Sequence, residues 1–529
     1  MTSSGVEESS SGVLSSRTVH QPHNPFWTEQ TTIVDKDGDK DKDKDHNANT
    51  SVIEETNESS ASNYEEANFL QQEDEFKLDI GPSLIIMILQ NVLLQISFFS
   101  IVSSSSAYAE YLGGTATFSG LVIGIPTAIS GLTLIPLMKY DKGLYKMPLH
   151  ITCASMVIGS MLYGLAYKAK FLYLILLGRM IQGSGMIGFL YTKRYCTDSR
   201  VVGIRRRTTL AGWLVLGQGI GMSAGPFFGG LLYKLGFNNS IFNGYTGPGW
   251  VMAGVWLAFW AASTMLFKDI QPNDQSHSSS SIQMSVLPPP STARPSFFQL
   301  SKRQWGVMAT MCWFAMTCFF ILGAWESNIP VFASSSSSIS GVKFTSLFSE
   351  IHIHNKAFPR AAYPLSPFSW SPFASGNFIA LGGITIFPFL FLNLLLARRI
   401  QDRHILALGS GLGLAGLLTT LALLRAQPVT GVLSYGAFFA CWFLVALGFN
   451  LASTCTLSLL SKQLPSSWNK QTSLAIQYSN FTGRVTGAVW GGSGVKVGML
   501  NYVGLEIAII GVGAVMFLTL WRELKAKTG

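Results

Sequence analysis

The sequence contains few charged residues for its length. Of its 529 residues, only 12% are Asp, Glu, Lys or Arg, whereas 48% are hydrophobic. Soluble domains have about 25% charged residues. This shortage of charge excludes an ordinary soluble protein. It indicates an all-α membrane protein that crosses the bilayer several times.

Cysteine and histidine are also scarce. The six cysteines show no metal or disulfide spacing, so we expect them to be small apolar packing residues. Six of the eight histidines lie outside the predicted spans, and the other two, His150 and His404, lie at the very start of one, which disfavours a buried histidine proton relay. The sequence has no nucleophile–base constellation and no phosphate-cradling loop after a strand. We therefore expect no enzyme activity, no cofactor or metal, and no nucleic-acid partner.

The charge that is present divides the chain in two. Residues 1–79 hold 18 acidic and 6 basic residues, whereas residues 80–529 hold 10 acidic and 31 basic ones, a net charge of +21. The acidic part has no apolar periodicity, and its beginning lacks the basic flank and apolar core of a signal peptide. Its Asp/Lys run at 35–45 lacks the Gly and Glu register of a calcium loop. We predict that 1–79 is a disordered cytoplasmic tail.

Twelve apolar runs are long enough to cross a bilayer, which takes about 20 residues per helix. The first six are 82–104, 112–137, 148–167, 171–193, 208–233 and 249–267. The second six are 304–333, 372–397, 404–424, 430–459, 472–494 and 498–521. The predicted domains are therefore a six-helix bundle over 80–267, a Ser/Pro-rich cytoplasmic linker over 268–303, a second six-helix bundle over 304–521 and a tail over 522–529.

The distribution of Lys and Arg predicts the orientation. With both termini in the cytoplasm, the cytoplasmic loops and tail carry 21 Lys and Arg residues and the opposite side carries 8, as the positive-inside rule requires. This orientation places an insertion at 334–370 on the non-cytoplasmic side. Asn238 falls on the same side in a glycosylation sequon, and the sequence leaves open whether it is modified.

Arg179 is the most informative single residue, because it lies inside the fourth predicted span. A charge there costs several kcal/mol unless a partner or a water-filled cavity receives it. It is followed by Gln182, Gly183 and Gly185, which gives the pattern Arg-x-x-Gln-Gly-x-Gly. This pattern is typical of a transporter.

A glycine-rich pattern in the fifth span concerns helix packing. It consists of Gly221, Gly225, Pro226, Gly229 and Gly230. Small residues let helices approach closely, and proline kinks them.

The loop between spans 2 and 3 runs from Asp141 to Lys146. These two residues could form gate contacts on the cytoplasmic face, or they could be plain positive-inside charges.

Six plus six spans around a central linker is the layout of a major facilitator transporter, with the substrate site between the halves. Residues 80–520 further resemble the membrane part of the plant SPX-type vacuolar phosphate transporters. The stretches that carry this resemblance are Ala107–Thr117, Gly178-Arg179, Lys193–Asp198, Pro248–Ala253, Glu326-Ser327, Asp402–Leu406, Leu459–Ser461 and Arg484-Val485. The lysosomal ceroid-lipofuscinosis-type major facilitator proteins look like more distant relatives.

The sequence also departs from the plant pattern. It has the acidic tail in place of an SPX domain, Lys193 in place of an arginine, and the extra insertion at 334–370. Losing the SPX domain bears on regulation more than on transport. Lysine donates from a single ammonium group, whereas arginine donates from a planar guanidinium that can hold two oxygens. The exchange at position 193 therefore changes the hydrogen bonds that could be made to phosphate.

Transport of an oxyanion needs donors and positive charge to replace the water it loses. The candidates for this role are Arg179, Lys193, Arg194, Tyr195 and Arg484. An anion between spans 4 and 11 would bridge the two halves. The alternatives are structural: Arg179 pairs with backbone carbonyls or with Glu326, Arg484 forms an ion pair, and Lys193 and Arg194 make a basic rim.

Only two acids lie clearly inside spans. Glu326 is the better candidate for proton coupling, whereas Glu506 is expected to face a neighbouring helix or the membrane interface. Glu110 and Tyr111 are expected near an outer gate, and Tyr108 could add a neutral donor.

The leading prediction is a carrier of a small inorganic anion, phosphate above all, in a vacuolar or lysosomal-type membrane. An anion channel, a carrier of another solute and a non-transporting sensor remain alternatives. The only other partner expected is membrane lipid.

Overall fold

The structure is a computed structural model that describes residues 81–140, 143–196, 198, 201–202, 207–236, 239–269, 300–334, 368–396, 400–430, 433–464 and 468–525. The predicted tail at 1–79, most of the linker and of the 334–370 insertion, Asp141 and Asn238 lie outside these residues. The structure therefore does not test the predictions made for these residues.

The regular elements of the described part are helices. The N-terminal half contains α2 (Pro82–Phe99), α3 (Ser105–Tyr111), α4 (Ala116–Tyr140), α5 (Lys146–Ala169), α6 (Leu172–Gly185), α7 (Gly188–Tyr195), α8 (Arg207–Leu235) and α9 (Gly247–Leu266). The C-terminal half contains α10 (Lys302–Ser334), α11 (Pro372–Leu396), α12 (Asp402–Thr430), α13 (Tyr435–Gln463), α14 (Asn469–Val497) and α15 (Met499–Thr519).

Each of the twelve predicted spans corresponds to one of these helices or to two consecutive ones, which confirms the all-α membrane fold. Within the described residues, ten segments are long and apolar enough to cross a bilayer by themselves. The helices α8 and α14 are 29 residues long but are not among the ten. Each packs against a helix of the other half, α8 against α11 and α14 against α4, and a more polar surface can be buried there against protein.

Two predicted spans are not single helices. The prediction of one helix over 82–104 is wrong at its end: α2 stops at Phe99, a turn follows, and α3 continues to Tyr111. The turn lies in a serine-rich stretch, and serine side chains offer backbone groups alternative hydrogen bonds. The span predicted over 171–193 breaks between α6 and α7, beside Gly185 and Gly188. Glycine weakens a helix by about 1 kcal/mol relative to alanine.

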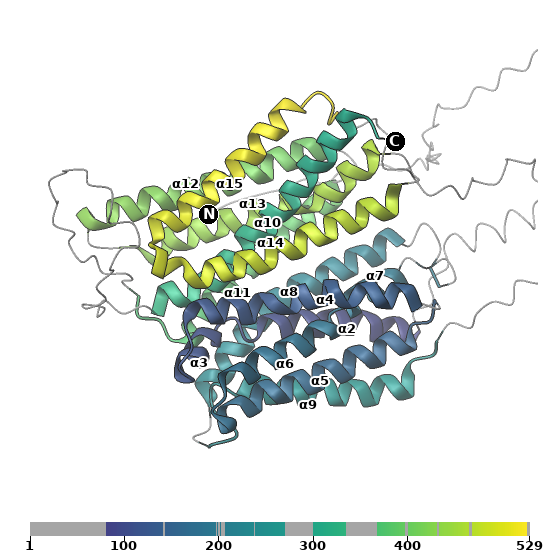
Figure 1. The fold of residues 1–529 in the computed structure, drawn as a ribbon, viewed down its shortest axis with the longest axis vertical. Helices are drawn as coiled ribbons and strands as arrows, with labels where there is room; N and C mark the ends of the chain where they lie inside the picture. Colours follow the sequence, from purple (N-terminus) through teal and green to yellow (C-terminus); the bar gives the residue numbers. More distant parts are fainter. Residues whose placement is uncertain are drawn as a thin grey trace, which may run out of the picture. The chain divides into compact units, whose positions relative to one another are not determined.

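Two helix pairs join the halves. Figure 1 shows α2 to α9 on one side and α10 to α15 on the other, with α4 beside α14 and α8 beside α11. Backbones approach closely at Gly120 and Gly492 between α4 and α14, and at Gly376 between α11 and α8. The Thr117 and Ser493 hydroxyls share a 3.0 Å hydrogen bond across the first pair.

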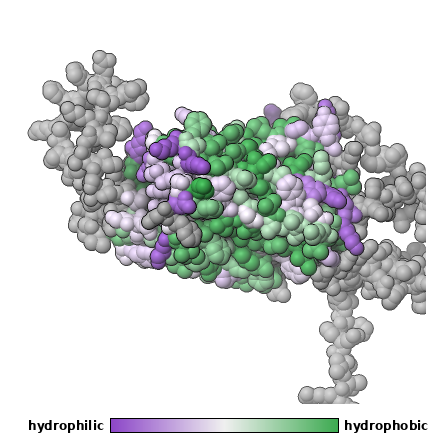
Figure 2. Space-filling model, turned by 90° about the horizontal axis from the view of Figure 1, so that it is seen from below, coloured by the Kyte–Doolittle hydropathy of each residue, from purple (hydrophilic) through white to green (hydrophobic). Residues whose placement is uncertain are grey.

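The outer surface suits a lipid environment. Large apolar side chains such as Leu132, Met265 and Leu518 are more than half exposed. Figure 2 shows apolar residues over the middle of the visible face and hydrophilic ones toward its two ends. An apolar band between polar ends is the surface that a bilayer selects.

The glycines of α8 form a close-packed contact with α2. A Cβ atom added at Gly221, Gly225 or Gly229 would lie 2.3 Å from Gln95 Cβ, 2.5 Å from Phe99 Cβ or 1.7 Å from Ser100 O, respectively. On the next face, Gly230 lies against α11. The pattern predicted to pack helices therefore fixes α2 in place, and α2 carries part of the candidate site.

Gly229→Ala should destabilise the protein. The new methyl group would overlap a backbone carbonyl that cannot rotate away, and overpacking of this kind costs about 1–3 kcal/mol. A lower midpoint of thermal unfolding in detergent is the expected result. The matched control is Gly254→Ala on α9, where nothing lies within 4 Å of the added Cβ. Equal unfolding midpoints in the two variants would contradict the packing argument.

Candidate functional site

Arg179 lies on α6 and is fully buried, with 0% of its surface exposed. Its Nε donates to the Val122 carbonyl of α4 at 3.2 Å, and its Nη1 donates to the side chain of Gln182. Among the described residues its Nη2 has no hydrogen-bond partner. The guanidinium is thus held from two sides, and its Nη2 nitrogen keeps both N–H groups unused.

The residues after Arg179 in its motif hold it in position. Gln182 connects the guanidinium to α5, because its Nε2 donates to Ser160 Oγ at 2.9 Å. The helices α5 and α6 touch through Gly159 and Gly178, where an added Cβ would lie within 2.7 Å of the opposite carbonyl oxygen. Gly183 makes the same kind of contact with Pro126 of α4. The motif therefore sets the arginine between α4 and α5.

Arg484, on α14 of the other half, is 7% exposed and forms an ion pair with Glu326 of α10. Glu326 is 2% exposed. The sequence left open a pairing between Arg179 and Glu326, and the structure pairs Glu326 with Arg484 instead. A buried carboxylate is stable only when paired and hydrogen-bonded, and Arg484 supplies both.

Phe98 brings the two arginines together. The Cζ atom of Arg179 lies 5.5 Å from the centre of the Phe98 ring, and that of Arg484 lies 5.1 Å from the same centre. Arg484 also lies 5.3 Å from the Phe99 ring. A ring within about 6 Å attracts a cation by its quadrupole. Two buried guanidinium groups, one from each half, thus meet at one aromatic side chain.

The other predicted basic residues lie elsewhere. Lys193 and Arg194 are exposed on α7, about 20 Å beyond Arg179 at the helical rise of 1.5 Å per residue. Tyr195 is buried, and its ring packs edge-on against Tyr145 at 5.1 Å. The structure brings Arg179 and Arg484 together but does not bring these three residues to them.

Near the start of α5, the predicted gate residue Lys146 is exposed. Its backbone N–H donates to Asp269 at 3.0 Å, and that of Tyr145 donates to the other oxygen of the same carboxylate at 3.1 Å. Asp269 therefore caps α5 from the start of the central linker. Asp141, the residue predicted to form the gate together with Lys146, is outside the described residues.

Tyrosines gather at the end of the N-terminal half where α3 ends. Tyr245 stacks on Tyr108 at 5.5 Å and on Tyr111 at 5.1 Å. The Tyr108 hydroxyl donates to the Tyr163 carbonyl, so it is not directed at the arginines. Burial, reinforced by Tyr233, raises the pKa of Tyr245 to about 12. Tyr245 is therefore uncharged at physiological pH, and pH dependence in that range must come from other groups.

Phe98 was not predicted from the sequence. A phenylalanine in an apolar helix is indistinguishable from a core or lipid-facing residue by composition. The sequence offers one indirect indication: Phe98 and Phe99 are the last two residues of α2, directly before a serine-rich turn.

The comparison with protein families identifies the fold. The sequence profile of the Major Facilitator Superfamily matches residues 87–488, which is most of the chain. The chain belongs to the Major Facilitator Superfamily. It is therefore a multi-pass integral membrane transporter. The two halves described above are the two helix bundles of a major facilitator.

Known proteins match this chain to different extents. An uncharacterized MFS-type transporter of Schizosaccharomyces pombe is 30% identical over 461 residues, which cover 84% of this chain and 83% of the relative. An SPX domain-containing membrane protein of Arabidopsis thaliana is 33% identical over 178 residues, or 34% of this chain and 25% of the plant protein.

Solved structures share the fold at low sequence identity. A POT family transporter in complex with 5-aminolevulinic acid has a TM-score of 0.60 at 12% identity, covering 86% of this chain and 99% of that one. A bacterial homologue of the lysosomal transporter Spinster has a TM-score of 0.56 at 15% identity, covering 83% and 96%. These likenesses concern the major facilitator fold alone.

Gly492→Ala should open the contact between the halves at the end where α4 begins. A Cβ atom at 492 would lie 2.3 Å from the Ala116 carbonyl oxygen across the interface. We expect a cysteine placed at Thr117 to react faster with a membrane-impermeant thiol reagent in this variant. Gly504→Ala on α15, where nothing lies within 4 Å, is the control. Unchanged labelling would show that this contact does not keep the halves together.

Proposed function

We propose that this chain carries a small inorganic anion, with phosphate as the first candidate, across an internal vacuolar-type membrane by alternating access. The observation that carries the proposal is the meeting of Arg179 and Arg484 at Phe98. One guanidinium comes from each half, and only Arg484 has a carboxylate partner among the described residues. The site thus has an excess of positive charge, which an anion would neutralise.

An anion bound here would connect the two halves. The unused Nη2 of Arg179 can donate to an oxyanion, and the planar guanidinium can hold two oxygens at once. A substrate that touches both halves stabilises the conformations in which they are close and must release one half for the site to open. That is the property that alternating access requires.

Glu326 provides a way to couple transport to protons. Its carboxylate and a bound anion would compete for the same Arg484 guanidinium. Protonation of Glu326 ends that competition, because a neutral acid no longer attracts the cation as strongly. One proton would then accompany each anion, and acid conditions would favour binding.

The choice of phosphate rests on the sequence resemblance described above and is supported by the similarity to the plant SPX domain-containing proteins. Both termini are proposed to be cytoplasmic, from the distribution of Lys and Arg. In that orientation Lys193 and Arg194 would attract anions at the cytoplasmic entrance, about 20 Å from the central site.

Uptake of radiolabelled phosphate into proteoliposomes, with and without an imposed pH gradient, tests the proposal. Saturable uptake that rises with an inward proton gradient is expected. Ion-selective currents without saturation would instead support a channel. Absence of uptake of phosphate, sulfate and other small anions would overturn the proposed function. Uptake that survives deletion of residues 1–79 would show that the acidic tail is dispensable for transport.

A further inference from the structure

A second buried carboxylate lies outside the arginine site. Glu506, on α15, is 0% exposed, and its Oε2 accepts a 2.9 Å hydrogen bond from Trp325 Nε1 of α10. Tyr502, one helical turn earlier on α15, places its hydroxyl near the same carboxyl. Within the described residues, neither Glu506 Oε1 nor the Tyr502 hydroxyl has a hydrogen-bond partner. The carboxyl and the hydroxyl are thus buried beside one another, close enough to interact but outside hydrogen-bond geometry.

Within the part of the chain that the structure describes, no cation balances this carboxyl. Among the residues that the structure describes, no Lys or Arg lies within 4.0 Å of Glu506. Among the described residues, the polar groups beside it are Trp325 Nε1 and the Tyr502 hydroxyl, from α10 and from its own helix.

The other charged groups described near α15 have partners of their own or face outward. Three form ion pairs: Glu326 with Arg484, Asp402 with Lys462, and Glu523 with Arg303. Arg403 and His404 pack on Trp521, and Arg425 and Lys496 are exposed. Burying an unpaired carboxylate costs far more than burying the neutral acid, so this position is suited to a carboxyl that binds and releases a proton.

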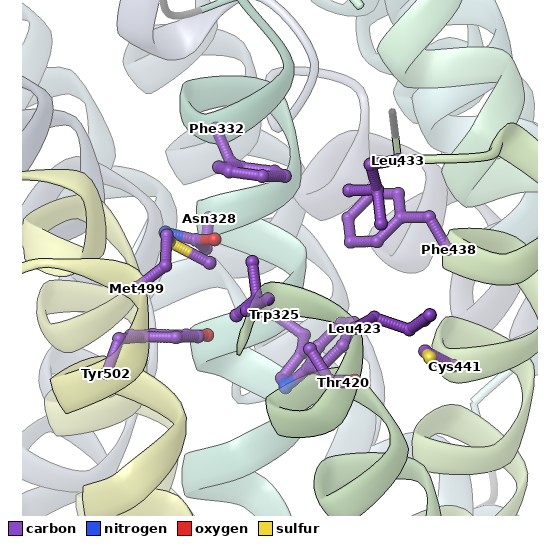
Figure 3. A pocket seen from close by; sticks show the side chains of 11 residues that line it. Trp325, Asn328, Phe332, Thr420, Leu423, Leu433, Phe438, Cys441, Met499 and Tyr502 are labelled. Atoms are coloured by element: carbon purple, nitrogen blue, oxygen red, sulfur yellow. The ribbon is translucent and has the colours of Figure 1, made fainter. Parts of the chain in front are cut away.

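A cavity reaches Tyr502, whereas Glu506 lies behind its lining. The cavity is lined by Trp325, Asn328, Thr420 and Tyr502 together with apolar residues of α10, α12, α13 and α15. About 10 Å³ is available to the centre of a water molecule, which is room for about one water. In Figure 3 the Tyr502 hydroxyl points toward Trp325. Leu433 and Met499 also line the cavity, so it lies toward the end of the bundle where α15 begins.

We propose that Glu506 is a second proton-binding site, reached through this cavity by way of the Tyr502 hydroxyl and separate from the Arg484–Glu326 pair. Proton binding at Glu506 does not depend on what the protein transports. Its effect on transport does rest on the proposed function.

The two carboxyls are connected through α10. Trp325, which donates to Glu506, is the residue next to Glu326 in the chain, and Asn328 of the same helix donates to the Gly491 carbonyl of α14 at 2.9 Å. A carboxylate holds the indole N–H more strongly than a neutral acid does. The charge on Glu506 therefore acts on the segment of α10 that positions Glu326 against Arg484.

Infrared difference spectroscopy of the full chain in lipid nanodiscs, between acid and alkaline pH, tests proton binding directly. The expected result is a protonated-carboxyl band that disappears in Glu506→Gln and persists in Glu326→Gln. Gln keeps an oxygen that accepts from Trp325, so the fold should be retained. Tyr502→Phe, which keeps the ring, should retain the band and slow its appearance after a pH jump. A band that is unchanged in Glu506→Gln would overturn the proposal.

Transport then separates this proposal from the previous one. In proteoliposomes, Glu506→Gln should leave the KM for phosphate, and its pH dependence through Glu326, unchanged. The maximal uptake rate should lose its dependence on the pH of the side of the membrane where α15 begins. If the wild type carries no phosphate but the band behaves as described, the proposed function fails and the proton site stands. A wild-type pH profile in Glu506→Gln would overturn the coupling to α10.

Discussion

Arg179→Ala should lower phosphate uptake at least about tenfold. The substitution removes a fully buried cation with an unused donor, and a hydrogen bond to a charged group contributes about 1.5–3 kcal/mol. That corresponds to roughly a 10- to 150-fold loss in binding alone. Initial rates of radiolabelled phosphate uptake into proteoliposomes measure the effect. Arg425→Ala, at an exposed position on α12, is the matched control and should transport normally.

Arg179 also ties α6 to α4 through the Val122 carbonyl, so the alanine variant could fail for structural reasons. Arg179→Lys separates the two roles, because it keeps the charge and loses the planar fork. A raised KM with an unchanged unfolding midpoint identifies contact with the anion. A lower midpoint with an unchanged KM would identify a role in the fold instead and would remove Arg179 from the binding site.

Glu326→Gln should uncouple transport from protons. With the carboxylate gone, Arg484 is permanently available to the anion, as it would be after protonation in the wild type. Exchange of phosphate for phosphate across the membrane should therefore continue. Accumulation driven by a pH gradient should be lost, and the KM should stop depending on pH.

Two separate assays check this expectation: counterflow of labelled phosphate for exchange, and gradient-driven uptake for accumulation. Loss of both in Glu326→Gln, with a lower unfolding midpoint, would mean that the ion pair only stabilises the fold. Breaking a buried pair from one side costs about 3–5 kcal/mol, so the midpoint must be measured in parallel. The double variant Glu326→Gln with Arg484→Gln removes both charges and should unfold at a higher temperature than Arg484→Gln alone.

Hydropathy and charge predicted the fold well, because the bilayer imposes a length and an apolar composition on each helix. Helix ends fell within a few residues of the predicted spans at most positions. The breaks after Phe99 and Gly185 were missed, since the apolar runs continue through them. Hydropathy does not register that serine and glycine weaken a helix locally.

The candidate site was predicted in part. Arg179, Arg484 and Glu326 stood out because charge is costly in a membrane, whatever the tertiary structure. Which of them pair could not be predicted, because Glu326 and Arg484 are 158 positions apart and only helix packing brings them together. Phe98 carries no charge and has no sequence signature, yet both arginines lie against it.

Equilibrium binding of radiolabelled phosphate to the purified protein tests most directly whether an anion sits between the two halves. Wild type, Arg179→Lys and Arg484→Lys are compared at one acidic pH, with Arg425→Lys as the control. Saturable binding is expected in the wild type and the control. Each of the other two variants should bind with a Kd at least about tenfold weaker, as expected for a lost bidentate contact. Equal Kd values in all four proteins would contradict an anion site between the two halves.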